Sequence, residues 1–253
     1  MSLLGADEPG PVEVLRPEGE ARFLLTADHA GRAIPRALGD LGVSAAELAR
    51  HIACDIGIAG VTRRLSALLD APAVLQYYSR LVIDCNRPVG AESAFPELSE
   101  ATVIPGNLGL DEAAKAVRRA AIFIPYHAAI TQALDARVQK AGRVIYVAMH
   151  SFTPVYLGEA RAMHVAVLYN RKPRFSRALA GLLRAEAGLV VGENDPYSVS
   201  DETDYGVPVH AERRGLDYVE IEIRQDLIQD EAGQAEWAGR LARLLPLAAA
   251  SLS

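Results

Sequence analysis

The stretch Arg143–Met149, which reads RVIYVAM, decides the fold, and it stops at His150. An apolar run of this length without polar alternation is typical of a strand that is buried on both faces. The stretch Arg22–Ala27, RFLLTA, has the same character and stops at Asp28-His29. We therefore expect two buried strands, each followed at once by a histidine.

Other strands and helices alternate along the chain. Further strands are expected at Ala73–Gln76, Arg80–Asn86, His164–Asn170, Leu189–Val191 and Tyr218–Arg224. Helices are expected over Ser44–Leu69, from Asp111 to Lys140 with a kink at Pro125, over Arg174–Ala187 and from Glu231 onward. The alternation predicts an α/β fold, a three-layer αβα sandwich with a mixed, mostly parallel central sheet.

The remaining segments suggest one domain with long loops. Residues 1–20 are rich in proline and glycine, and we expect a flexible N-terminal arm ahead of a single domain at 21–253. The stretches 87–110 and 192–207 show no periodicity. Unstructured stretches of this length in a compact domain are usually lids or binding loops.

Composition excludes several classes of protein. The 253 residues are 50% hydrophobic, too many for a disordered chain, and the net charge of −6 argues against nucleic acid or an anionic membrane as a partner. No apolar run could span a bilayer, and the N-terminus does not resemble a secretory signal. Cys54 and Cys85 form no CxxC pair, so we expect reduced cysteines and a cytoplasmic location. The sequence contains neither a G-x-G-x-x-G motif nor a P-loop, so no motif indicates nucleotide binding.

The two histidines at strand ends suggest a metal site. Functional groups in α/β sheets lie beyond the carboxyl ends of strands, so His29 and His150 are expected to meet there. One such histidine alone is more often structural, but two at equivalent positions favour a metal ion with a third protein ligand. Asp55, within ACDIGIAG, is a candidate for that ligand, and an exposed helical acid is an equal alternative.

The stretch YVEIEIR places Glu220, Glu222 and Arg224 on one face of a strand. In an edge strand this would be an ordinary solvated face. If helices cover both faces of the sheet, these charges must pair or bind a ligand. Glu222 is then the candidate general base for a metal-activated water.

A second polar line leads into the loop at 87–110. Arg80 and Asp84 have the spacing of an internal ion pair. Arg87 is instead a candidate to bind a substrate carboxylate through two hydrogen bonds, and Asn86 would add a contact from its side-chain amide. His210, just before the Glu222 strand, is a candidate to reach the same pocket and assist catalysis.

Several short motifs, in this order, resemble the N-formylglutamate amidohydrolase family over about Leu24–Asp226. They are Asp28–Gly31, Ile34-Pro35, His51–Gly57, Tyr78–Pro88, Pro125–His127, His150–Pro154, Asn194–Tyr197, His210–Leu216 and Glu220–Leu227. The resemblance implies a phosphorylase/hydrolase-like fold similar to zinc carboxypeptidases. It also implies a divalent metal, zinc, and hydrolysis of the N-formyl or N-acyl amide of an acidic amino acid.

The resemblance also implies roles for individual residues. The metal positions match His29, Asp55 and His150, the base position matches Glu222, and the carboxylate-binding pair matches Asn86-Arg87. Further substrate contacts are expected from Arg213 or Arg224, which would meet a side-chain carboxylate, and from Tyr197; Arg80 is expected to stabilise the oxyanion.

The sequence around the first motif, Asp28–Gly31, differs from related patterns in two ways. Three residues after His29 stands Arg32, where the carboxypeptidase-like pattern has a glutamate ligand, so the carboxylate must come from elsewhere. The motif itself reads DHAG, where the deformylating branch resembles a Pro-His-Ser-Gly form, which leaves the acyl group open.

Two other functions remain as alternatives. One is a metal-independent hydrolase with Ser151 or Cys85 as nucleophile, although the sequence lacks G-x-S-x-G. The other is a non-catalytic protein that binds a small carboxylate. The expected partner in either enzymatic case is a small-molecule N-acyl amino acid, and the sequence leaves the oligomeric state open.

Overall fold

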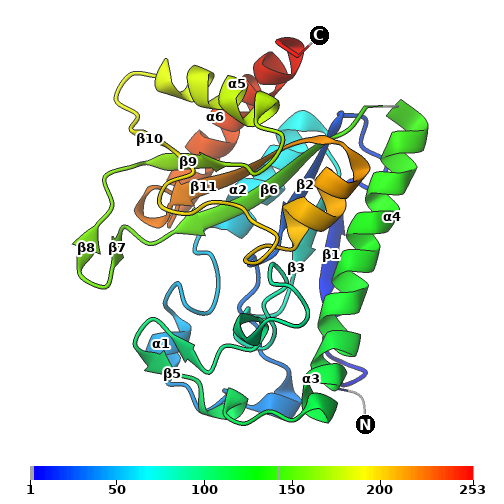
Figure 1. Cartoon of the computed structure of the whole chain (residues 1–253), viewed down its shortest axis with the longest axis vertical. Helices are drawn as coiled ribbons and strands as arrows, with labels where there is room; N and C mark the ends of the chain where they lie inside the picture. The colour runs from blue at the N-terminus through cyan, green and yellow to red at the C-terminus, as the bar shows by residue number, and fades with distance from the viewer. Residues whose placement is uncertain (1–2, 142, 253) are drawn as a thin grey trace.

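A computed structural model of the chain describes residues 3–141 and 143–252. Its centre is a seven-stranded sheet with the order β1-β3-β2-β6-β11-β9-β10 (Figure 1). The strands are β1 (Val12–Leu15), β2 (Phe23–Ala27), β3 (Ala73–Gln76), β6 (Ile145–Phe152), β9 (Val165–Leu168), β10 (Val191–Glu193) and β11 (Asp217–Arg224). Two small hairpins lie outside it, formed by β4 (Leu98–Ser99) with β5 (Thr102–Val103) and β7 (Val155–Tyr156) with β8 (Glu159–Ala160).

Four of the six strand pairings in the sheet are parallel. The parallel pairs are β3–β2, β2–β6, β6–β11 and β9–β10, whereas β1–β3 and β11–β9 are antiparallel. The central strands β2 and β6 are buried along their whole length. Burial on both faces explains their continuous apolar sequences.

Helices cover both faces of this sheet. They are α1 (Ala45–Leu48), α2 (Ile58–Leu69), α3 (Glu112–Arg118), α4 (Ile124–Ala141), α5 (Arg174–Arg184) and α6 (Glu231–Ala250). One apolar core packs α2, α5 and α6 on the first face, and a second core packs α4 on the other (Figure 1). The predicted three-layer α/β architecture with a mixed, mostly parallel sheet is confirmed. No helix in the described part of the chain is long and apolar enough to cross a membrane.

The predicted helix Ser44–Leu69 is wrong in its middle. Ser44 does cap a helix, since its hydroxyl accepts from the Glu47 amide at 3.3 Å, but α1 ends at Leu48. The chain then turns until α2 begins after Gly57, whose φ of +82° favours glycine. A Cβ at Gly57 would also lie 2.1 Å from the Ile228 carbonyl oxygen, so both the backbone angle and the lack of space require glycine here.

The predicted strand Arg80–Asn86 is also wrong. These residues form turns in which the Ser79 hydroxyl accepts from the Leu81 amide and Asp84 accepts from the Asn86 amide. Such side-chain bonds replace a strand ladder. Residues 81–86 are all buried, so their alternating sequence does not separate an inner face from a solvent face.

Smaller differences concern element ends. The helix expected from Asp111 to Lys140 is split into α3, a π-helical turn at Arg119–Phe123 and α4, with Pro125 in the first turn of α4. β6 continues two residues past His150, and β10 begins at the end of the strand expected at Leu189–Val191. The proposed arm at 1–20 contains β1, and the division into an arm and one domain stays a prediction.

Candidate metal centre and substrate cavity

The register of the sheet brings three predicted site residues together. β2 and β6 are parallel neighbours, and β2 ends at Ala27, so His29 follows beside His150. In β11, Glu222 is the direct partner of His150. Paired residues on parallel strands point to the same face, so Glu222 and His150 share the side of the sheet that α4 covers.

Asp55 reaches the same place from the turn ahead of α2. Its backbone amide donates to the His29 carbonyl at 2.9 Å, which ties the turn to the end of β2. Its Oδ2 accepts from the Ser151 amide at 3.1 Å and lies 3.1 Å from His150 Nδ1 and 3.6 Å from His29 Nδ1. One carboxylate oxygen therefore faces one nitrogen of each histidine.

His29, Asp55 and His150 form a ligand set that suits a divalent metal. One ligand atom from each lies within 4.8 Å of the other two, and all three side chains are buried. His29 Nδ1 and Glu222 Oε2 are buried without a hydrogen-bond partner among the described residues. Unsatisfied buried atoms are costly unless a ligand completes them, and two imidazoles with a carboxylate fit zinc.

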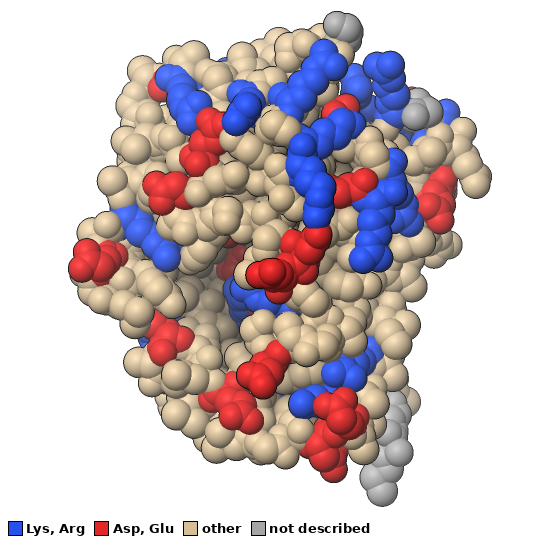
Figure 2. All heavy atoms as spheres, viewed as in Figure 1, with Lys and Arg blue, Asp and Glu red and all other residues tan. Residues whose placement is uncertain are grey.

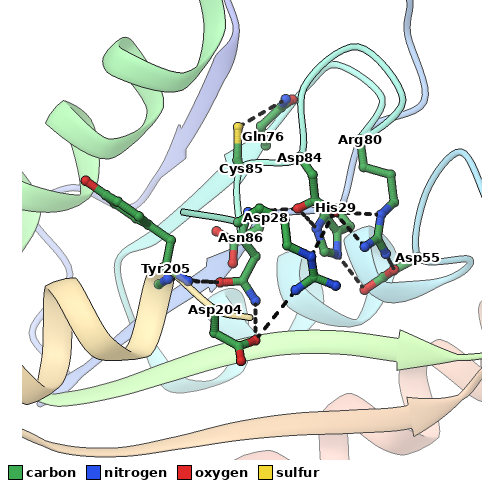
Figure 3. A network of polar contacts seen from close by, with 12 residues as sticks. Asp28, His29, Asp55, Gln76, Arg80, Asp84, Cys85, Asn86, Asp204 and Tyr205 are labelled. Atoms are coloured by element: carbon green, nitrogen blue, oxygen red, sulfur yellow. Dashed lines mark hydrogen bonds and ion pairs between the residues drawn. The ribbon is translucent and has the colours of Figure 1, made fainter. Parts of the chain in front are cut away.

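Two further carboxylates contact the far side of these imidazoles. His29 Nε2 lies 2.7 Å from Asp84 Oδ1, and His150 Nε2 lies 3.5 Å from Asp28 Oδ2. Asp28 in turn accepts from the Tyr126 hydroxyl at 2.6 Å. Figure 3 shows the contacts of His29 with Asp84 and Asp55, one at each ring nitrogen. A carboxylate behind a metal-binding histidine holds the ring and its tautomer and directs the opposite nitrogen toward the metal.

The network shifts the pKa values of its members in opposite directions. Burial raises the pKa of Glu222 to about 7, against the opposing charges of His150, His29 and Arg80. Burial would also raise the pKa of Asp55, but His29 and His150 hold it well below its usual range. One carboxylate is therefore kept ionised while another is poised to exchange a proton near neutral pH.

A cavity of about 540 Å³ opens over these residues. Figure 2 shows the hollow, with basic side chains inside and acidic ones near its rim. Eight residues predicted from the sequence line it, namely His29, Asp55, Arg80, Asn86, Arg87, His150, Tyr197 and Glu222. Segments far apart in the sequence thus converge on one site.

The cationic side of the cavity is built on Arg80, Asn86 and Arg87. Arg80 donates to Asp84 Oδ2 from Nη2 at 2.6 Å and from Nε at 3.1 Å, which is the ion pair expected from the spacing. Arg87 donates to the Thr203 carbonyl. Asn86 Oδ1 accepts two backbone amides of the loop after β10, so the amide also joins the two long loops (Figure 3).

Three other candidates do not line the cavity. His210 Nε2 instead lies 2.8 Å from His127 Nδ1, on the α4 side of the sheet. Arg213 is exposed. Arg224 pairs with Asp226 and donates to the carbonyls of residues 161–163.

The structure adds residues that the sequence did not assign. Asp28 contacts His150 and Asp84 contacts His29, Asp204 accepts from Asn86 Nδ2 at 3.2 Å, and Phe152 and Tyr156 line the cavity. Asp28 could have been assigned to the site from the sequence, since it directly precedes His29 at a strand end. Asp204 could not, because it lies in a loop whose sequence has no periodicity.

The alternative nucleophiles lack the environment that they need. Burial raises the pKa of the Cys85 thiol well above its usual value, which disfavours the reactive thiolate. The Ser151 hydroxyl donates to the Ile56 carbonyl at 3.0 Å and lacks a histidine partner among the described residues. Within the described part of the chain, neither nucleophile is hydrogen-bonded to the base that nucleophilic catalysis requires.

Comparison with known proteins agrees with this geometry. The chain is similar to a gene product from Agrobacterium tumefaciens at 39% identity over 99% of both chains, with a TM-score of 0.94. It shares the fold of an N-formylglutamate amidohydrolase from Ralstonia eutropha JMP134, at 20% identity over 95% of this chain and 98% of that one, with a TM-score of 0.69. No curated protein matches the sequence.

The family comparison covers most of the chain. The sequence model of N-formylglutamate amidohydrolase matches residues 21–229. The matched segment begins just before β2 and ends just after β11, so it includes every residue that lines the cavity. The predicted resemblance is therefore confirmed, and this chain belongs to the N-formylglutamate amidohydrolase family of amide-cleaving hydrolases.

Proposed function

We propose that the protein is a metal-dependent amidohydrolase that cleaves the N-formyl or N-acyl amide of an acidic amino acid such as N-formyl-L-glutamate. The observation that carries the proposal is the buried set of His29, Asp55 and His150 with the carboxylate of Glu222 beside it. A divalent cation held by this set, zinc by its ligand chemistry, would polarise the amide carbonyl and lower the pKa of water.

The residues of the chain supply the rest of the reaction. Glu222, with a pKa of about 7, accepts the proton of the attacking water and passes it to the leaving amine nitrogen. Arg80 places a positive charge beside the centre, where the carbonyl oxygen becomes an oxyanion. Arg87 grips the substrate α-carboxylate, and Asn86 has one amide hydrogen left to donate to it.

The replacement Glu222→Gln tests the catalytic step apart from the site itself. Because glutamine keeps the shape but cannot take a proton, we expect hydrolysis of N-formyl-L-glutamate to fall by about 10²–10⁴-fold. Zinc content after dialysis should stay at the wild-type level. In the wild type, kcat/KM should decline as pH falls through the pKa of Glu222, at or below about 7, because the base must be ionised.

The control is Glu193→Gln, which changes a glutamate that pairs with Arg184 away from the cavity and should keep full activity. Full activity of the metal-stripped wild type would overturn the metal-dependent proposal in favour of a metal-independent hydrolase. Binding of N-formyl-L-glutamate without any turnover by the zinc-loaded wild type would favour a carboxylate-binding protein instead.

A further inference from the structure

An aromatic wall closes one side of the cavity, and a single arginine supports it. Phe152, Tyr156 and Tyr197 all line the cavity. The guanidinium carbon of Arg161 lies 5.8 Å from the ring centre of Phe152 and 4.9 Å from those of both Tyr156 and Tyr197. Three rings around one cation fix both the rings and the cation.

Arg161 is bonded to the wall through one hydroxyl. Its Nη1 donates to the Tyr197 hydroxyl at 2.8 Å. The phenol oxygen accepts this bond, so its own O–H remains available to donate. No carboxylate lies within 4 Å of the Arg161 guanidinium in the described stretches 3–141 and 143–252, whereas Arg80 is paired with two aspartates. The charge of Arg161 is therefore not neutralised by a neighbour.

The backbone around Arg161 is held in place from both sides. The Arg161 amide donates to the Pro154 carbonyl at 2.9 Å, across the β7–β8 hairpin. Arg224, at the end of β11, donates to the Arg161 carbonyl at 3.1 Å. Arg224 was expected to meet the substrate, and the geometry gives it a supporting position behind Arg161 instead.

The charge of Arg161 extends into the cavity. His51 lines the cavity next to the metal-site turn. Burial lowers the pKa of His51, Glu100 acts against this lowering, and Arg50, Arg80 and Arg161 add to it. The aromatic side of the cavity thus combines a hydroxyl donor with a cation, unpaired among the described residues, directly behind it, and a donor supported in this way suits an anionic group.

We propose that the Tyr197 hydroxyl binds the side-chain carboxylate of the substrate and that Arg161 acts behind it as the positioning residue that makes the site prefer an anion. This inference rests on the proposed function, in which Arg87 holds the α-carboxylate of the substrate. The second carboxylate then determines specificity. Arg213 and Arg224, the cations expected there, do not line the cavity.

The test compares two substrates that differ by one charge, N-formyl-L-glutamate and N-formyl-L-glutamine. In Arg161→Met we expect kcat/KM for the glutamate substrate to fall about tenfold or more, mainly through KM, because a charge-assisted contact is lost. The kcat/KM for N-formyl-L-glutamine should change less than about twofold, since binding of its uncharged side chain does not use the charge of Arg161. Arg161→Lys should restore part of the preference, because lysine keeps the positive charge.

The matched control is Arg177→Met. Arg177 also stacks on a tyrosine, with its guanidinium 5.3 Å from the Tyr169 ring centre, and donates to that hydroxyl at 3.1 Å, but it lies outside the cavity. Its substitution should leave the preference for the anionic substrate unchanged. Equal losses on both substrates in Arg161→Met, or an unchanged preference, would overturn the inference.

A second readout separates this inference from the proposed function. Titration calorimetry compares binding of L-glutamate and L-glutamine to the zinc-loaded protein, without any turnover. Stronger binding of glutamate in the wild type, lost in Arg161→Met, supports the inference even if no N-formyl amino acid is hydrolysed. Equal binding of both amino acids by the wild type would overturn it even if hydrolysis is observed.

Discussion

Two pairs of histidines in this molecule have nearly the same ring separation and different surroundings, with the rings at 69° in the first pair and at 20° in the second. The ring centres of His29 and His150 lie 5.0 Å apart, and those of His127 and His210 lie 5.1 Å apart. All four side chains are buried. The first pair lines the cavity, whereas the second lies between α4 and the segment before β11.

The neighbours of each pair determine its chemistry. Burial and Arg80 would lower the pKa of His29, but Asp84 and Asp55 raise it. Burial would lower the pKa of His150 too, but Glu220, Asp28 and Asp55 raise it well above its usual value. Such surroundings favour a positive charge, and a divalent metal supplies one.

For His127 and His210 the effect of burial exceeds the opposing effect of Asp28. His127 Nε2 donates to the Cys85 carbonyl at 2.9 Å, and the ring centres of Phe123 and Tyr205 lie 4.2 and 4.4 Å from that of His127. Burial lowers the pKa of His127 to about 4 and, together with the charge of His127, that of His210 to about 3. A buried histidine therefore becomes a candidate ligand through its carboxylates, and burial alone makes it a neutral structural group.

The largest expected effect comes from exchanging one histidine of each pair for glutamine. His150→Gln removes a proposed metal ligand, so we expect loss of stoichiometric zinc and a drop in hydrolysis of N-formyl-L-glutamate of about 10³-fold or more. His127→Gln should keep zinc and most activity while lowering the melting temperature. Zinc analysis and kcat/KM on the same preparations measure both. Loss of zinc in His127→Gln, or its retention in His150→Gln, would erase the distinction between the pairs.

A smaller effect is expected from the carboxylate behind His29. Asp84→Asn weakens the 2.7 Å contact that holds His29 Nε2, and the loss of such a partner typically costs about 10–100-fold in metal affinity. Chelator competition measures this affinity directly. Asp204→Asn is the matched control, because Asp204 belongs to the same network but bonds to Asn86 and contacts neither histidine. Similar losses in both variants would show that the network as a whole, and not the histidine contact, sets the affinity.

The sequence predicted the layers of the fold and eight of the residues that line the cavity, largely because both follow from short-range patterns. Buried strands such as β2 and β6 are continuous apolar runs, and parallel strands necessarily bring their carboxyl ends to one edge of the sheet. The positions of His29, His150 and Glu222 at this edge therefore follow from the sequence. Asp55 depended on the family resemblance, since its turn looks helical in sequence.

The failures arose where tertiary contacts override local patterns. Arg80–Asn86 alternates like a strand, yet its side chains bond to their own backbone and both sides are buried. His210 precedes β11 and so was expected near Glu222, but the π-helical turn at Gly206–Ala211 directs it toward His127. Arg161 carried no signal, because three aromatic residues from separate segments surround it only in the folded chain.

The smallest expected effect is on the pH dependence of the free energy of unfolding, and it concerns the pair His127 and His210 alone. His127 and His210 have native pKa values of about 4 and 3, below the value of about 6.5 expected in the unfolded chain. As pH falls below 6.5 the unfolded chain binds protons first, so the free energy of unfolding decreases by up to about 1.4 kcal/mol per pH unit for each histidine. This loss continues until the native pKa values are reached.

His210→Gln tests this because the glutamine amide can still donate to His127 Nδ1 but cannot bind a proton. Urea denaturation between pH 6.5 and 5 should then show a shallower fall in the free energy of unfolding than in the wild type, and the comparison cancels the groups that titrate in both proteins. An unchanged slope in His210→Gln would mean that His210 is protonated in the native protein, and the two pairs would then differ in position but not in charge.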